Sequence, residues 1–116
     1  MSLTQVAFLL FAAIAAGGLT MAAIIAFGKS PPSFMGPGHG IGGLVACATL
    51  FVANLRGGAV TPEAAWWALI VFTSGLAGGL LLFRVLFKGA TPLILVAGHG
   101  SVAALGLYLL YPLTGF

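Results

Sequence analysis

The stretch Val6–Phe27 decides the fold: it reads VAFLLFAAIAAGGLTMAAIIAF and contains no charged residue. A helix of about 20 apolar residues is long enough to cross the roughly 30 Å hydrocarbon core of a bilayer. Three more apolar segments follow, Pro37–Leu55, Ala64–Phe87 and Pro92–Tyr111, and the first of these could begin as early as Pro32. Because short breaks rich in Gly, Pro and charged residues separate the segments, they predict four transmembrane helices.

The composition excludes a water-soluble globule. The chain has 116 residues, of which 61% are hydrophobic and only 4% charged, whereas a soluble domain carries about 25% charged residues. In lipid every backbone N–H and C=O must be paired internally, which leaves helices or a closed barrel. Barrel strands alternate polar and apolar residues, and these segments are continuously apolar. We therefore expect an all-α integral membrane protein, a single transmembrane domain over residues 1–116 with the lipid bilayer around it.

The loops predict the topology and the orientation. Because they are short, neighbouring helices should be antiparallel, in an up-down-up-down bundle. The first and third loops then share one side with Lys29, Lys88 and the nearby Arg84, and the other side holds Arg56, Glu63 and both termini. Since cytoplasmic loops carry an excess of Lys and Arg, we expect loops one and three in the cytoplasm and both termini outside, in a bacterial inner membrane. The net charge of +3 is spread over loops and helix ends, so we expect no nucleic-acid partner.

Two Thr-Pro dipeptides predict where the last two helices begin. Thr61-Pro62 precedes the third apolar segment, and Thr91-Pro92 precedes the fourth. Threonine is a frequent N-cap residue, and proline is favoured at the first helical position. We therefore expect Thr as the N-cap and Pro as the first residue of both helices.

The chain also contains an internal repeat with an offset of 60 positions. Its clearest part aligns Gly38-His39-Gly40 with Gly98-His99-Gly100, and these tripeptides contain the only two histidines. The halves, about residues 1–58 and 59–116, are each predicted to be a helical hairpin, and the two hairpins run the same way. A parallel repeat implies a pseudo-twofold axis along the membrane normal. The histidines should then lie at matching depth and face each other from the second and fourth helices.

This histidine pair is the candidate functional site, because an ionisable residue inside a transmembrane segment is costly and usually functional. His39 and His99 lie on diagonal helices, too far apart for a direct hydrogen bond, but both could ligate a metal ion at the centre of a macrocycle. Neutral imidazole is a good iron ligand, and two axial histidines suit electron transfer.

A flat macrocycle needs room beside its ligands, and small residues would provide it. They fall at helical spacing from the histidines and at similar depth on the other two helices: Gly42, Gly43, Ala103, Gly106, Gly18 and Gly78. Lys29, Arg84 and Lys88 gather on the membrane side nearer the histidines and would pair with haem propionates.

This arrangement resembles the haem sites of membrane b-type cytochromes, in which histidines lie on two helices and glycines on the flanking pair. The resemblance implies haem b as the cofactor, His39 and His99 as the iron ligands, and electron transfer with a redox partner or within a larger membrane complex. A quinone site using one histidine could stand beside the haem. No acid–base pair or activated nucleophile is visible, so we do not expect an enzyme acting through its own side chains.

Pro37 disturbs the symmetry of the two histidines. If the second helix starts at Pro37, His39 lies near the membrane interface and not at the depth of His99. If the helix starts at Pro32, Pro37 removes one intrahelical hydrogen bond from the first turns. The haem hypothesis favours the second case.

Other interpretations of the same residues remain open. A non-catalytic accessory or assembly subunit of a larger complex fits the small size and the lack of a soluble domain. The small multidrug resistance transporters have four helices in about this length, but they rely on a carboxylate in the first helix, and the only acid here is Glu63 in a loop. A chlorin-type pigment held through magnesium would also use histidine. Close helix packing would explain the glycines on their own, and the single Cys47 is expected to pack as a small hydrophobe.

Overall fold

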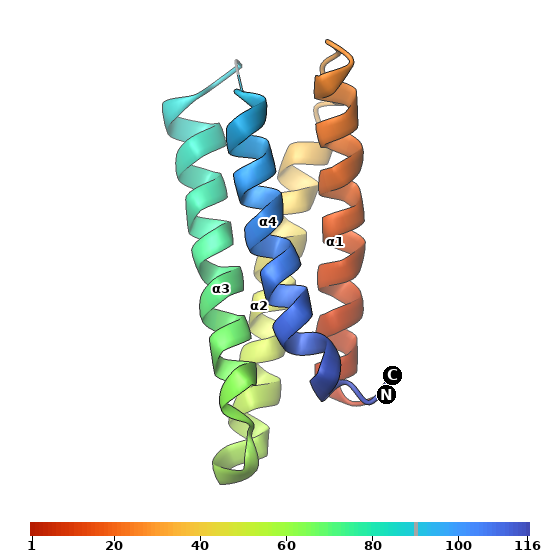
Figure 1. The fold of residues 1–116 in the computed structure, drawn as a ribbon, viewed down its shortest axis with the longest axis vertical. Helices are drawn as coiled ribbons and strands as arrows, with labels where there is room; N and C mark the ends of the chain where they lie inside the picture. Colours follow the sequence, from red (N-terminus) through yellow and green to blue (C-terminus); the bar gives the residue numbers. More distant parts are fainter. Residues whose placement is uncertain (90) are drawn as a thin grey trace.

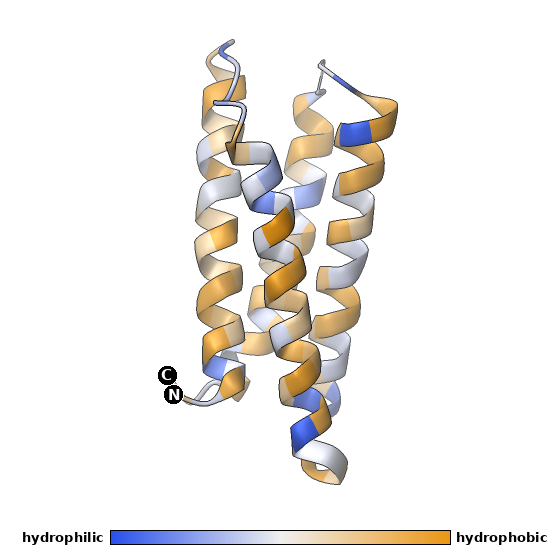
Figure 2. Ribbon diagram, turned by 180° about the vertical axis from the view of Figure 1, so that it is seen from behind, coloured by the Kyte–Doolittle hydropathy of each residue, from blue (hydrophilic) through white to orange (hydrophobic). Residues whose placement is uncertain are grey.

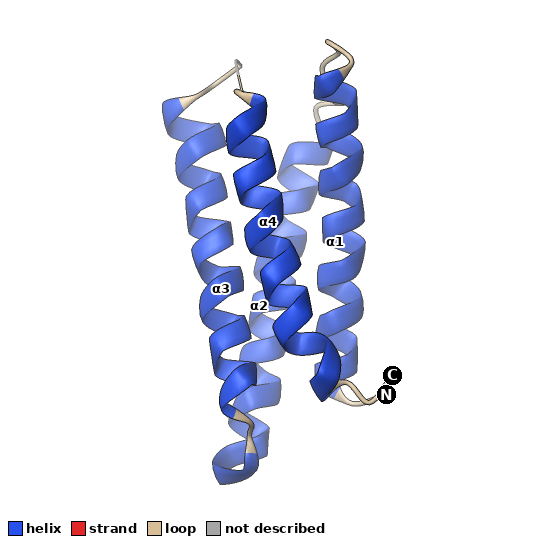
Figure 3. Ribbon diagram, in the orientation of Figure 1, coloured by secondary structure: helices blue, strands red, loops and turns tan. Residues whose placement is uncertain are grey.

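The computed structural model describes residues 1–89 and 91–116, and it is a bundle of four helices (Figure 1). The main helices are α1 (Leu3–Ala26), α2 (Met35–Gly57), α3 (Glu63–Leu80) and α4 (Leu93–Leu110). Three shorter elements are the 3-10 turn η1 (Gly58–Val60), the π-helix η2 (Leu81–Leu86) that continues α3, and the 3-10 turn η3 (Tyr111–Leu113). No strand occurs among the described residues (Figure 3).

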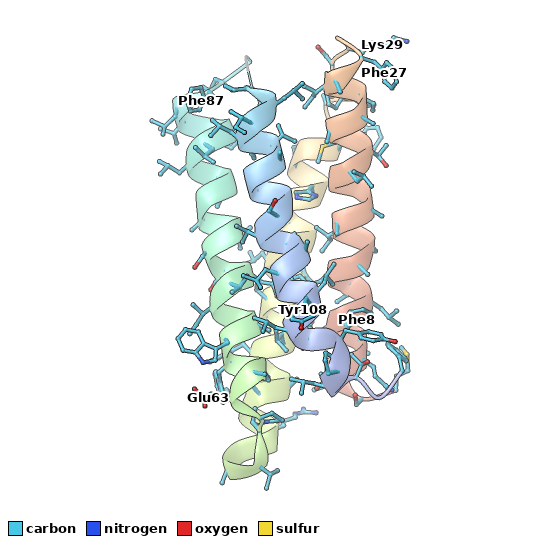
Figure 4. All side chains as sticks on the ribbon, in the orientation of Figure 1. Phe8, Phe27, Lys29, Glu63, Phe87 and Tyr108 are labelled. Atoms are coloured by element: carbon cyan, nitrogen blue, oxygen red, sulfur yellow. The ribbon has the colours of Figure 1, made fainter. Side chains whose placement is uncertain are left out.

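The helices alternate in direction, so both termini lie at the same end of the bundle (Figure 1). We call this the terminal end, and we call the opposite end, where the described residues 27–34, 87–89 and 91–92 lie, the loop end. Lys29 lies at the loop end and Glu63 at the terminal end (Figure 4). Helices α1 and α3 each pack against both α2 and α4, which makes α1 diagonal to α3 and α2 diagonal to α4. The prediction of four alternating helices is confirmed.

All four helices, with their short extensions, are long and apolar enough to cross a membrane. The bundle is 46 Å long and 24 by 21 Å across, which exceeds the roughly 30 Å hydrocarbon thickness. Hydrophobic residues cover most of the ribbon along its length (Figure 2). Large apolar side chains such as Leu19, Ile41 and Ile94 are exposed, which is the surface that lipid rather than water would solvate.

The structure places the start of α2 between the two predicted positions. The helix begins at Met35, and its first regular hydrogen bond runs from the Gly38 N–H to the Phe34 carbonyl. Pro37 is therefore the third helical residue, where the backbone N–H of an α-helix has no partner within the helix. Its missing N–H removes no hydrogen bond, and His39 lies within the helix.

The predicted caps of α3 and α4 are wrong. Pro62 and Pro92 are themselves the N-cap residues, and neither helix has a side-chain cap. The Thr61 hydroxyl instead donates to the Asn54 carbonyl at 2.7 Å, so it satisfies the end of α2. Only α1 has a capping box, in which the Ser2 hydroxyl accepts from the Gln5 backbone and the Gln5 side chain accepts from the Ser2 backbone.

The close-packed core lies entirely in the half of the bundle near the terminal end. Its members come from the N-terminal parts of α1 and α3 and the C-terminal parts of α2 and α4: Ala7, Phe11, Ala46, Cys47, Leu50, Ala68, Phe72 and Leu110. Phe11 and Phe72 stack across the α1–α3 diagonal, with ring centroids 3.5 Å apart and planes inclined by 6°. Cys47 packs as a buried free thiol, as predicted.

The half near the loop end, which we call the loop half, is built differently. None of the described residues within 17–45 or 73–105 is fully buried. Both histidines lie in this half, on its α2 and α4 sides. The bundle therefore combines one half with a core of buried side chains and one half without fully buried described residues, and the second half contains both histidines.

Candidate functional site

The two imidazoles face each other across the interior of the loop half. His39 is four residues into α2 and His99 six residues into α4, which corresponds to about 6 Å and 9 Å of helix rise. Their ring centroids are 6.0 Å apart and their planes are inclined by 59°. Both side chains are partly buried. The residue pair identified by the repeat is thus brought together from diagonal helices.

Each imidazole rests on a glycine of the neighbouring helix. A Cβ atom on Gly18 of α1 would lie 2.8 Å from Cε1 of His39, and a Cβ on Gly79 of α3 would lie 2.9 Å from Cε1 of His99. Real Cβ atoms essentially never approach so closely. Any side chain at either position would therefore displace the imidazole that packs there.

The 60-residue offset aligns Gly18 with Gly78, but the glycine against which His99 packs is Gly79. Around Gly78 there is open space for a Cβ atom. The matching contacts of α1 and α3 are related by 61 positions: Phe11 stacks on Phe72, and the pair Gly17-Gly18 corresponds to Gly78-Gly79. The sequence itself indicates the 61-residue offset, because its two glycine doublets lie 61 positions apart.

The change of offset has its origin in the loops. Helices α2 and α4 keep the offset of 60, since Leu50 and Leu110 are both fully buried. Gly28 and Gly89 follow α1 and η2 with φ angles of +72° and +78°, and they are again 61 positions apart. Leu50 therefore follows Gly28 by 22 positions and Leu110 follows Gly89 by 21. The second half is one residue shorter over this stretch, and a gapless alignment cannot match both pairs of helices.

Three of the predicted small residues pack against other side chains. Gly42 lies against Ile14, and a Cβ on Gly43 would lie 3.5 Å from the Leu76 side chain. Gly106 lies under the Phe72 ring, where a Cβ would be 2.6 Å away. These glycines allow close helix packing, and Gly106 belongs to the packed half. Ala103 is partly buried, one turn beyond His99 on α4.

The predicted basic residues, Lys29, Arg84 and Lys88, lie at the loop end and are exposed. The Arg84 guanidinium reaches from η2 to the first turn of α2, where it lies 3.4 Å from the position of a Cβ on Gly36. The loop end thus places one cation directly above the side of the bundle that holds His39.

Phe83 is a site residue that the sequence analysis missed. It belongs to η2 and packs edge-on against His99, with ring centroids 5.5 Å apart and planes at 89°. It stands one helical turn beyond Gly79, so the correct glycine register would have indicated it. π-helical turns are rare and often occur at functional sites.

The polar atoms of the site are incompletely paired. Nδ1 of His39 is buried and has no hydrogen-bond partner by distance and angle, and the backbone of Ile14 is its neighbouring polar group. Buried polar atoms without a partner are uncommon and call for an explanation. Within residues 1–89 and 91–116, no three His, Cys, Asp or Glu side chains come together as a metal site. The donor set is therefore two imidazoles from opposite helices.

Comparison with known proteins gives no assignment: no family model matches this chain, and neither the curated proteins nor the solved structures provide a significant match.

Proposed function

We propose that this chain is a membrane-embedded b-type haem protein that relays single electrons, with His39 and His99 as the two axial ligands. The observation that carries the proposal is the separation of the imidazoles. A nitrogen–metal bond of about 2.0 Å on each side of one ion gives ring centroids roughly 6.3 Å apart. The separation of 6.0 Å is close to this value.

The donor set also favours a macrocycle over a bare ion. Metal sites built only from protein side chains use three or four ligands, and the described residues offer two. A haem supplies four nitrogen donors itself, so two histidines complete six-coordination. A six-coordinate iron has no free position for substrate, which favours electron relay. Bound haem would supply the one-electron iron couple, and the protein would supply ligands, an apolar environment and compensating charge.

The packing of the bundle fits a flat group in the loop half. Gly18 and Gly79 leave no side chain between the histidines and the neighbouring helices. The Phe11–Phe72 stack forms the boundary of the packed half, and Phe11 precedes Gly18 by seven residues, or about 10 Å of helix rise. We propose that the macrocycle lies between this stack and the loop end, with its propionates toward Lys29, Arg84 and Lys88.

We also propose that the bundle spans a bacterial inner membrane with the loop end in the cytoplasm. The length and apolar surface of the four helices support insertion. The charge asymmetry supports the orientation, since three of the four Lys and Arg residues lie near the loop end. In this orientation electrons would exchange with a partner near the cytoplasmic surface, because the histidines lie close to that end.

A non-catalytic subunit of a larger membrane complex is the second candidate. The lack of fully buried described residues in the loop half favours it, since a partner helix could cover that half as well as a cofactor could. This candidate predicts a colourless protein. The two functions are compatible if the haem protein is itself a subunit.

An absorption spectrum of the detergent-purified protein tests the proposal. We expect a Soret band that shifts on reduction with dithionite, together with resolved α and β bands of low-spin six-coordinate haem. His39→Ala and His99→Ala should each remove the low-spin spectrum, and the double variant should lose haem altogether. A protein that stays colourless after expression with added haem would rule the proposal out and favour the subunit role.

A further inference from the structure

We propose that the two histidines are inequivalent ligands: His99 is the permanent one, and His39 occupies an exchangeable position that a small neutral molecule can take. This inference rests on the proposed haem function and adds a second property to the same site. The exogenous ligand belongs to the class that binds reduced iron, for which carbon monoxide is the probe. The difference between the two histidines arises from their neighbours and from the helices that hold them.

The neighbours of the two imidazoles differ at one corresponding position. Each ring packs against a glycine of the neighbouring helix, His39 against Gly18 and His99 against Gly79. One helical turn further on, α3 continues into η2 with Phe83, whose edge packs against His99, whereas α1 has Ala22. Alanine has no ring to restrain His39. An aromatic contact therefore limits the movement of His99 and has no counterpart at His39.

The helix segments that hold the histidines also differ, and this difference again leaves His39 less firmly held than His99. Both α2 and α4 start without a side-chain cap, but His39 lies in the second turn of α2, directly after Gly36, Pro37 and Gly38. His99 lies two residues deeper in α4. The residues before it are Val96, Ala97 and Gly98, so it has one glycine where α2 has two glycines and a proline. Because glycine disfavours helix and helix ends fray, the start of α2 opens more easily than the start of α4.

Neither imidazole takes part in a hydrogen bond among the described residues, and Nδ1 of His39 is buried without a partner. Tightly held metal-binding histidines donate this proton to a carbonyl or carboxylate, so both rings are free to move, and the difference between them rests on Phe83 and on the two helix starts. An opening of the first turn of α2 would let the His39 imidazole move away as a neutral ligand, and the position it holds toward a bound haem would become available to the incoming molecule. No proton or electron moves in this exchange.

The first experiment compares two single variants of the full chain after expression with haem. His39→Ala should retain haem as a five-coordinate, high-spin species that binds carbon monoxide when reduced by dithionite. His99→Ala should retain at least fivefold less haem, because the remaining ligand lies on the weaker segment. Equal haem retention by both variants, or a greater loss of haem in His39→Ala, would overturn the inference. The haem proposal itself would still stand if the unmodified protein showed the low-spin spectrum.

A matched pair of glycine variants tests the same point with both histidines present. A Cβ on either Gly38 or Gly98 meets no atom within 4 Å, so alanine fits at both positions. Gly38→Ala should weaken carbon monoxide binding to the reduced protein by up to about fivefold, since alanine stabilises the first turn of α2. Gly98→Ala should leave the affinity unchanged. An equal effect of both substitutions, or none from Gly38→Ala, would contradict the inference.

Removal of the aromatic contact completes the test. Phe83→Ala should make the surroundings of His99 like those of His39 and increase carbon monoxide affinity by roughly two- to tenfold, the range expected for an aromatic pair. Phe27→Ala, at an exposed position of the same end, is the control and should change nothing. If Phe83→Ala leaves the affinity unchanged, Phe83 does not position His99 and this part of the inference fails. A chain without any haem would instead refute the proposed function.

Discussion

At the scale of single residues, the candidate site depends on two glycines, because the lack of a side chain at each lets an imidazole pack directly against the neighbouring helix. Each supports one imidazole, and in each case a Cβ would fall within 3 Å of ring atom Cε1. At the neighbouring glycines of the two doublets, Gly17 and Gly78, a Cβ would meet no atom within 4 Å. The chain thus offers two pairs of adjacent glycines in which only one member touches a histidine.

The first prediction uses these doublets. Gly18→Ala and Gly79→Ala should each push an imidazole out of place, lower haem retention severalfold and reduce the free energy of unfolding of the loaded protein by about 1–3 kcal/mol, the usual cost of overpacking. Haem absorbance per mole of purified protein and thermal unfolding followed at the Soret band would measure both effects.

Gly17→Ala and Gly78→Ala are the matched controls, because they add the same methyl group one residue away. They should behave like the unmodified chain. If the two members of a doublet respond alike, the substitutions act through helix packing in general and not through the histidines.

At the scale of elements, polar contacts join the helices only in the terminal half of the described bundle. Asn54 is 2% exposed, and its Nδ2 donates to the Ala65 carbonyl of α3 at 3.0 Å. Gln5 of α1 donates to the Thr114 carbonyl near the C-terminus at 3.0 Å. These bonds link α2 to α3 and the first residues to the last, so they hold the two hairpins together at the end opposite the histidines.

The second prediction concerns the link between α2 and α3. Asn54→Ala should lower the free energy of unfolding by about 0.6–1.7 kcal/mol, the range for hydrogen bonds between membrane helices. It should leave the haem spectrum unchanged, because Asn54 is more than three helical turns from His39. Unfolding by titration with a denaturing detergent would measure the stability.

Thr49→Ala provides the control on the same helix. The Thr49 hydroxyl donates to the Val45 carbonyl of its own helix, so its loss should cost much less than the loss of Asn54. Equal destabilisation by both substitutions would show that the interhelical bond makes no special contribution.

The sequence was sufficient to predict the four helices and the histidine pair, but not the details that depend on neighbouring elements. Continuous apolar runs are a local property, so they identified the helices to within a few residues. The caps at Thr61 and Thr91 were wrong because competing hydrogen-bond partners, such as the Asn54 carbonyl, become visible only in three dimensions. Gly79 was displaced and Phe83 was missed because the second half has one residue fewer between the glycine that follows η2 and the buried leucine of α4, so α1 and α3 match at an offset of 61 and not 60.

At the scale of the whole molecule, stability and the candidate site are separated along the bundle axis. The buried side chains and the interhelical hydrogen bonds lie toward the terminal end, and the histidines lie toward the loop end. A bundle that is held together at one end can adjust at the other without unfolding. This division suits a site whose two ligands must close on a flat group.

The same axis relates the site to the proposed orientation in the membrane. Lys29, Arg84 and Lys88 lie near the loop end, and Arg56 lies near the terminal end with Glu63. A C-terminal fusion to alkaline phosphatase, which is active only outside the cytoplasm, should therefore be active in a bacterial host. A C-terminal green fluorescent protein, exported in unfolded form, should stay dark.

The third prediction is that the loop-end cations determine this orientation. Replacement of Lys29, Arg84 and Lys88 together by Gln leaves Arg56 as the only Lys or Arg side chain, so the charge bias reverses and a large share of the molecules should insert the other way. Arg56→Gln, the control, should keep the original orientation, because it enlarges the bias. If the triple variant keeps full phosphatase activity, the charges do not set the topology. The only role left for these basic residues would then be the proposed one at the site, as partners for the propionates of the proposed haem.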